Sequence, residues 1–501
     1  MLTQYIFSCN FMKKYTKGGN LMRYKKFIIT VLFCLATFFI GIHNLFAYGE
    51  YNTPDSWGLH TTPGGFKDSY EGIKLGNIAI MDMNLTTRYR IRANEYADDQ
   101  DLYQYVRGSI KGIKLGEGTV EASYFLRFAD DIDGTDREHF FDDSLDLGLD
   151  GGNWDTRFYH GEITFDNVIA NTKIVMGRQY VSHLETIQID GLDVAYEIND
   201  KFTIYGFSGG AVSYFDDWND DWIHGGGFEF KPFNGTKIRA EYIRANVEDF
   251  SDDIVNVRAD QVVPYGSVYA QFGNLDNAQS LELGGNFILP KLGTIFNLKY
   301  EGVYDEVSDD NSYIENPLTY ALLPSGKYDL FNISAYQGFL EHYMLGAGVE
   351  YRNANGKNDF FNRDYTKFFT SFDIMGLPTD GTYISLFVEK WDTEDNNEAD
   401  DEQKLQVGGS ITQQITPEFD IYAGTKYDRY KYDFVEFDYG DLTLARGRKR
   451  ESIRTYYFGG KWEPNKRISL IVDCNIENSD VFDDDDFENN YTVEAWLNIA
   501  L

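Results

Sequence analysis

The last eleven residues of the chain alternate between apolar and polar side chains up to the final position. One face of an extended strand carries Tyr491, Val493, Ala495, Leu497, Ile499 and Leu501, and the opposite face carries Thr492, Glu494, Trp496, Asn498 and Ala500. A period of two over about ten residues is typical of an outer-membrane β-barrel strand, in which one face meets lipid and the other meets the lumen. We therefore expect a barrel that closes on its own last strand.

The same alternation recurs along most of the 501 residues, which favours one large all-β domain. Aromatic residues are abundant, with Tyr 37 and Phe 38, whereas Pro is only 10. After residue 47 no stretch contains the roughly 18 consecutive apolar residues that a transmembrane helix needs. An array of soluble β-sandwiches is the alternative, but the sequence has no internal repeat and no linker. The pattern predicts a transmembrane antiparallel β-barrel.

The N-terminus has the features of a Sec signal peptide. Arg23, Lys25 and Lys26 precede an apolar run over residues 27–42, and Leu45-Phe46-Ala47 is an acceptable cleavage site. Export is thus expected to end with cleavage near Ala47.

Translation is expected to begin at Met22, because Lys17-Gly18-Gly19 is the peptide that a ribosome-binding site would encode. This predicts four segments: an upstream extension over residues 1–21, a signal peptide over 22–47, a periplasmic lead-in over 48–77 and a single barrel over 78–501. The lead-in is too short to form a plug domain.

The charge of the exported chain excludes one class of partner. Removing residues 1–47 takes away six Lys/Arg and no acids, which leaves 39 basic against 80 acidic residues and a formal net charge near −41. Such a chain would repel nucleic acid. Only Cys474 remains, so an intrachain disulfide is excluded. No C-x-x-C-H motif is present, and we expect no cofactor.

Two kinds of connection separate the alternating segments. Acidic clusters occur at Asp98-Asp99, Asp130-Asp131-Asp133, Asp216-Asp217, Asp220-Asp221, Asp309-Asp310, Glu394 to Glu402 and Asp483 to Asp486. Short turns occur at Gly116-Glu117-Gly118, Asn199-Asp200-Lys201, Phe233-Asn234-Gly235, Pro290 to Gly293, Thr416-Pro417-Glu418 and Pro464-Asn465-Lys466. This asymmetry predicts long acidic extracellular loops and short periplasmic turns. Nine short-turn hairpins between a first strand near 78–95 and the last strand predict 18 to 20 strands, within a range of 16 to 20.

The most specific polar pattern lies in the first expected strand. Arg88, Arg90 and Arg92 share one face, and apolar residues occupy the other. Because an arginine facing the bilayer midplane costs about 2–4 kcal/mol, the three arginines are expected to face the lumen as a ladder of guanidinium groups.

Arg107, Lys111 and Arg127 in the next two strands are expected to extend this ladder. One interpretation is a basic track that guides anionic solutes, since arginine offers a fork of donors suited to carboxylate or phosphate. The other is that these bases pair with lumen carboxylates such as Glu121 and only stiffen the wall. The sequence leaves both open.

Three short motifs resemble the alginate-export and related porin families. Arg88-Tyr89-Arg90, Met176-Gly177-Arg178-Gln179 and Asp190-Gly191-Leu192 follow the order of the R-x-R, G-R-Q and D-G-L segments of those families. The resemblance implies a Gram-negative porin with Arg88, Arg90 and Arg178 in its charged pore lining. The terminal Leu501 departs from the Phe or Trp with which most such barrels end.

Arg178 shares the parity of Met176, so strict alternation would turn it towards lipid. A bulge at Gly177 would turn it inward, and glycines inside strands often mark bulges. We expect the inward orientation.

Other motifs do not support enzymatic activity. Gly206 to Gly210 fits G-x-S-x-G, but the segment continues as strand instead of turning into a helix. Asp131, Asp133 and Asp136 have a spacing that is a candidate for Ca²⁺, although the rest of an EF-hand loop is missing. The alternative is a solvated acidic rim whose cations bridge lipopolysaccharide phosphates.

The sequence therefore predicts an outer-membrane porin, a passive diffusion channel for small hydrophilic solutes that include anions. An alternative of a different class is the barrel scaffold of a porin–cytochrome electron conduit, which would enclose a multihaem partner. An outer-membrane hydrolase is a third possibility, weakened by the lack of an evident nucleophile–base pair. The expected surroundings are outer-membrane lipid and lipopolysaccharide.

Overall fold

A computed structural model describes most of the predicted barrel domain. The described residues are 73–76, 78–94, 98–132, 154–212, 222–247, 250–275, 278–305, 327–355, 364–393, 403–438, 443–479 and 489–500. Contacts divide the chain into residues 1–47 and 48–501, and every described residue belongs to the second unit. The predicted upstream extension and signal peptide lie outside the described residues.

The described residues form strands joined by turns. The strands are β1 (Ile73–Leu75), β2 (Ala79–Ala93), β3 (Asp98–Leu115), β4 (Gly118–Asp131), β5 (Trp154–Asp166), β6 (Thr172–Ser182), β7 (Thr186–Asn199), β8 (Phe202–Ala211), β9 (Trp222–Phe230), β10 (Thr236–Val247), β11 (Phe250–Val263), β12 (Gly266–Leu275), β13 (Ala278–Leu289), β14 (Thr294–Val303), β15 (Tyr328–Phe339), β16 (Tyr343–Ala354), β17 (Tyr365–Met375), β18 (Thr382–Thr393), β19 (Gln403–Thr416), β20 (Phe419–Asp438), β21 (Thr443–Asn465), β22 (Ile468–Ser479) and β23 (Asn489–Ala500).

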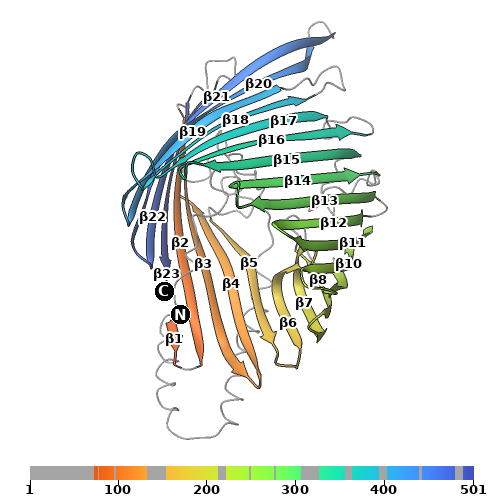
Figure 1. The fold of residues 1–501 in the computed structure, drawn as a ribbon. Coiled ribbons are helices and arrows are strands. Elements are labelled where there is room, and N and C mark those ends of the chain that lie inside the picture. The colour runs from red at the N-terminus through yellow and green to blue at the C-terminus, as the bar shows by residue number, and fades with distance from the viewer. Residues whose placement is uncertain are drawn as a thin grey trace. The chain divides into compact units, whose positions relative to one another are not determined.

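The sheet closes on itself. Each strand from β2 to β23 pairs antiparallel with its neighbour in sequence, and β23 pairs with β2 from Tyr491↔Ala93 to Ala500↔Asn84 (Figure 1). The chain is thus an antiparallel β-barrel, as predicted. The short β1 pairs with β2 just beyond the end of β23, through Ile73↔Met81 to Leu75↔Ala79. It lies within the predicted lead-in.

The two faces of the sheet differ in polarity. Large apolar side chains on one face are exposed, for example Leu283, Phe331, Leu345, Leu386 and Phe458. On the other face, polar side chains are buried against one another; examples are Thr86, Glu241, Asn256, Asp373 and Asn498. The apolar face suits lipid and the polar face suits a lumen, so the barrel is of the transmembrane type.

The closed sheet has more strands than the sequence predicts. Among the described residues it contains 22, β2 to β23, instead of 16 to 20. All six short turns named from the sequence join strands, but ten hairpins are closed in this way and not nine. The β15–β16 turn is hard to recognise in the sequence, because its left-handed residues are not glycine: Leu340 has a φ of 52° and Glu341 of 59°. Such residues rarely adopt this conformation and carry a weak turn signal.

Connections at the opposite barrel end are less uniform than predicted. Those over residues 132–153, 304–327 and 480–488 are long in sequence, but β6–β7, β10–β11 and β12–β13 are joined by only a few residues. Asp98-Asp99 and Asp130-Asp131 belong to β3 and β4 and not to loops, because arginines pair with part of this acidic set. The remaining acidic clusters lie outside the described residues. Within the described ranges, no helix is long and apolar enough to cross a membrane.

Candidate functional site: the charged inner wall

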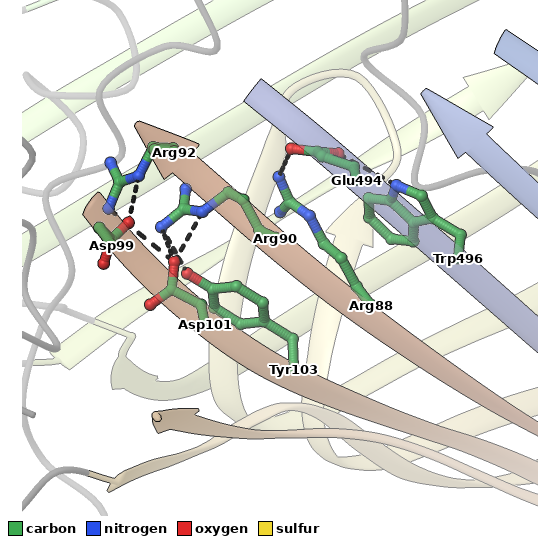
Figure 2. Close-up of polar contacts among 8 residues, drawn as sticks. All are labelled: Arg88, Arg90, Arg92, Asp99, Asp101, Tyr103, Glu494 and Trp496. Carbon is green, nitrogen blue, oxygen red and sulfur yellow. Dashed lines mark hydrogen bonds and ion pairs between the residues drawn. The ribbon is translucent and has the colours of Figure 1, made fainter. Parts of the chain in front are cut away.

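The arginine ladder lies on the inner face of β2. Arg88, Arg90 and Arg92 share the parity of the buried Thr86, as predicted, and β3 and β23 flank them on either side (Figure 2). Each guanidinium group is partly buried, with 15–18 % of its side chain exposed.

Every arginine of the ladder contacts a carboxylate. Arg92 Nε donates to Asp99 Oδ2 at 2.5 Å, and Arg90 Nε donates to Asp101 Oδ2 at 2.7 Å. Both pairs are directly opposite in the β2–β3 register. Arg88 reaches the other way, across the seam, and donates through Nη2 to Glu494 on β23 at 2.5 Å. The ladder is therefore a row of arginines on β2 with carboxylates of β3 on one side and of β23 on the other (Figure 2).

Aromatic rings support the ladder from the same face. The Arg88 guanidinium carbon lies 4.7 Å from the ring centre of Trp496 and 5.2 Å from that of Tyr103. The Tyr103 hydroxyl also accepts a hydrogen bond from Arg90 at 2.8 Å. Cation–π contacts in a partly desolvated setting contribute about 0.5–2 kcal/mol each. Ion pairs and ring contacts together hold the guanidinium groups in fixed positions.

The other predicted bases of the wall separate into two places. Arg127 is buried, with its guanidinium carbon 5.7 Å from the Tyr103 ring, and it belongs with the ladder. Arg107 and Lys111 lie nearer the short-turn end, where they line a cavity of about 460 Å³. Glu121, named from the sequence as a pairing partner for the ladder, lines this cavity instead.

Arg178 has a different setting. It keeps the parity of the exposed Met176 and Tyr180, and the β6–β7 register runs through Gly177 without a bulge. Gly177 instead has a φ of 122°, and a Cβ there would lie 2.2 Å from the Gly161 carbonyl oxygen. The glycine thus permits close approach of β5, and the expected bulge is wrong.

The Arg178 guanidinium binds at the edge where β5 and β6 stop pairing. It donates from Nε and Nη2 to the two carboxylate oxygens of Asp190, at 2.8 and 2.7 Å, and from Nη1 to the Phe158 carbonyl at 2.8 Å. Gln188 donates to the next carbonyl of β5, that of Tyr159. Both side chains thereby complete the backbone hydrogen bonding of a strand edge. That Arg178 lines the pore stays a prediction.

One connection folds against the inner wall. Residues 183–185 join β6 to β7, and the Glu185 carboxylate accepts hydrogen bonds from Asn256 on β11 at 2.7 Å and from Gln271 on β12 at 3.2 Å. The Glu185 amide donates to the Glu241 carboxylate on β10 at 2.9 Å. Burial, and then the neighbouring Glu241 charge, raises the pKa of Glu185.

His183, two residues before Glu185, anchors the other side of this connection. Its Nε2 lies 2.9 Å from Asp193 Oδ1, its ring stacks on Tyr205 at 3.7 Å, and its carbonyl accepts from Arg239 at 2.9 Å. We call residues 183–185 the inner latch. The sequence gives no signal for it, because the contacts of Glu185 and Arg239 depend on the register of strands 56 to 86 residues away.

The described residues contain no group of three or more potential metal ligands placed to hold an ion. Asp131 is buried at the end of β4, whereas Asp133 and Asp136 lie outside the described residues. Gly206 to Gly210 lies within the continuous strand β8, so it does not form a nucleophile elbow.

A serine–histidine contact, missed from the sequence, occurs in the cavity. Ser123 Oγ lies 2.8 Å from His160 Nε2, and Glu162 lies 3.8 Å from the same nitrogen. A catalytic triad needs the carboxylate on the other imidazole nitrogen, so that the ring is oriented towards the serine. The contact is therefore a polar lining of the cavity.

Comparison with known proteins returns structural likenesses alone. No protein-family model matches the chain, and no curated protein matches it in sequence. Acinetobacter baumannii OccAB1 overlaps 87% of this chain and 99% of its own, at 9% identity and a TM-score of 0.40. Pseudomonas aeruginosa OpdQ overlaps 86% and 99%, at 11% and 0.41. The PapC usher translocation pore overlaps 83% and 99%, at 9% and 0.45. Likeness at this level does not assign the chain to a family.

Proposed function

We propose that the protein is an outer-membrane porin that lets small hydrophilic solutes diffuse passively through its lumen. The observation that carries the proposal is the polarity of the closed sheet. Its outer face exposes large apolar side chains, whereas its inner face carries paired charges, amides and hydroxyls. A 22-stranded sheet with such an inner face encloses more space than its own side chains fill.

The proposal includes the route to the membrane and the surroundings there. The signal peptide over residues 22–47 would direct Sec export and be cleaved near Ala47, and outer-membrane lipid and lipopolysaccharide would surround the barrel. The motifs that resemble alginate-export and related porins are compatible with this location.

A preference for anions is the finer part of the proposal. The ladder offers three guanidinium groups, but Asp99, Asp101 and Glu494 contact them one for one. Paired charges present a smaller net field to a passing ion than free ones. We therefore expect the ladder to contribute a weak anion preference at most.

The test is conductance of the purified protein in planar bilayers, with a KCl gradient to read the reversal potential. Stable open steps are expected. The triple variant Arg88→Gln, Arg90→Gln, Arg92→Gln leaves three acids and should shift selectivity towards K⁺. Adding Asp99→Asn, Asp101→Asn and Glu494→Gln removes these acids and should restore the original reversal potential.

A folded barrel without any conductance would refute the channel proposal. It would then favour a lumen occupied by a partner, which is the arrangement of the electron-conduit alternative. Folding is checked independently for each variant by the difference in electrophoretic migration between heated and unheated samples.

A further inference from the structure

The cavity at the short-turn end of the inner wall has a regular construction. Four neighbouring strands contribute one residue each to a row, Asp82 on β2, Ser109 on β3, Ser123 on β4 and Glu162 on β5, paired in register. The two serines in the middle are small, and the two acids at the ends are longer. The row therefore forms a polar floor between two carboxylates.

Basic side chains border this floor along β3. Arg107 precedes Ser109 by two residues and Lys111 follows it by two, so all three share a face. At about 3.3 Å per residue, each base begins roughly 7 Å from the serine. Lys111 and Gly112 form a bulge opposite β4, between the pairs Ile110↔Ala122 and Ile113↔Val120, and Gly112 has a φ of 79°. Bulges of this kind redirect a side chain.

The charges of this cavity are arranged differently from those of the ladder. In the ladder each arginine contacts a carboxylate. In the cavity, Lys111 and Glu121 line the same space, yet among the described residues no ion pair joins them to each other or to Asp82. Charges of both signs therefore face the same cavity.

We propose that this cavity is a binding site for small zwitterions, solutes that carry a carboxylate and an ammonium group on one compact skeleton. The carboxylate would bind between Arg107 and Lys111 over the serine hydroxyls, and the ammonium would bind towards Glu121 and Glu162. The site deepens the porin proposal and rests on it, because it supposes that such solutes enter the lumen.

Charge and size both favour this class of solute. A simple anion would meet two bases but three carboxylates, and a simple cation would meet the bases. A zwitterion satisfies both sets at once, and each contact is a charge-assisted hydrogen bond. A volume of about 460 Å³ lies within the range of small-molecule sites and exceeds that of one free amino acid.

Four solutes of nearly equal shape test the assignment. Alanine is a zwitterion, lactate an anion, alaninamide a cation and lactamide neutral. We would measure uptake of radiolabelled alanine into liposomes that contain the full-length exported protein, and its inhibition by an excess of each unlabelled compound. Saturable uptake that alanine inhibits much more strongly than the other three is expected.

Two variants remove one charge of each sign from the cavity. Lys111→Gln and Glu121→Gln should each lower uptake at low alanine concentration about three-fold, the size expected for one partly solvated charge contact. Lys299→Gln is the matched control. Lys299 is also on the inner wall, but it is ion-paired with Glu301 at 2.7 Å, away from the cavity. Alanine uptake by the Lys299→Gln variant should equal that by the unmodified protein.

Two results would overturn the proposal, and they are distinguishable. Normal KCl conductance, together with alanine uptake that is linear and equally inhibited by all four solutes, would refute the binding site and leave the porin intact. Absence of both ion conductance and alanine uptake would refute the porin function and the site together.

Discussion

The buried carboxylate of Asp101 is the residue on which the ladder most depends. Its side chain is 0% exposed, Arg90 binds it directly, and Arg92 Nη2 lies 3.8 Å away. A charge taken out of water is tolerated only when a partner compensates it. The ladder arginines therefore have a structural role in addition to any effect on solutes, and removing them without their partners carries a cost.

A double-mutant cycle measures this cost. We expect Arg90→Gln to lower the free energy of unfolding by about 3 kcal/mol, because it strips the main partner from a buried charge. Arg90→Gln with Asp101→Asn should lose much less, since no charge remains uncompensated. Denaturant unfolding in detergent micelles gives both values.

The control is Lys237→Gln, whose ion pair with Glu229 at 3.3 Å is more solvated, with the lysine 42% exposed. A change below about 1 kcal/mol is expected there. Equal losses for Arg90→Gln and for the double variant would contradict the compensation argument.

Two of the three ion pairs of the ladder could have been predicted from the sequence. Arg92 with Asp99 and Arg90 with Asp101 are placed symmetrically about the β2–β3 turn, so locating that turn would have paired them. The cluster Asp98-Asp99 was interpreted instead as part of an acidic loop, and Asp101 was not singled out. The pairing of Glu494 with Arg88 could not be predicted, because it depends on the register in which the last strand pairs with the first, 406 positions away.

At the scale of elements, the inner latch binds to the wall on two sides, through the carboxylate of Glu185 and the ring of His183. The negative charges of Glu241 on β10 and Glu282 on β13 raise the pKa of Glu185. The positive charge of Arg258 on β11 lowers it. From the other side, His183 faces Asp193 and Tyr205. The carboxylates outnumber the bases around Glu185, which adds to the effect of burial.

These contacts give the latch a defined pH dependence. The pKa of Glu185 is raised when the latch is docked, so docking is strongest below the ordinary glutamate pKa. The stabilisation is lost as pH rises through the elevated pKa. We expect single-channel current fluctuations from latch opening to increase with pH above that value.

Glu185→Gln keeps the docked hydrogen-bonding shape without the charge and should abolish this pH dependence. Glu301→Gln, a change on a different part of the wall, serves as control and should leave it unchanged. The proposed role would be contradicted if Glu185→Gln fluctuated with the same pH profile as the unmodified protein.

The elements themselves were predicted unevenly. The six turns named from the sequence contain Gly, Asn or Pro, and all six join strands, because these residues supply the required dihedrals. The turn at Leu340–Glu341 was harder, since sheet pairing on both sides, and not local preference, imposes its positive φ values. One extra hairpin accounts for the rise from 20 to 22 strands.

At the scale of the whole molecule, alternation predicted the closed sheet and its two faces, because each strand repeats the same pattern independently. It could not predict which connection folds against the inner wall or which side chains line the cavity there. The latch and the serine-floored cavity arise from register between strands, which a period of two leaves undetermined.

The two-faced barrel leads to a prediction from adjacent residues of β18. Leu386 is 48% exposed on the apolar face, whereas Ser385 points inward opposite the buried Asp373. Leu386→Arg should make folding into lipid vesicles less favourable by about 2–4 kcal/mol, because it places a charge in hydrocarbon. Ser385→Arg places the same charge beside a carboxylate in the lumen and should fold with near-normal stability, though with reduced conductance. A larger penalty for Ser385→Arg than for Leu386→Arg would mean that the two faces are reversed, and equal penalties would mean that neither face meets lipid.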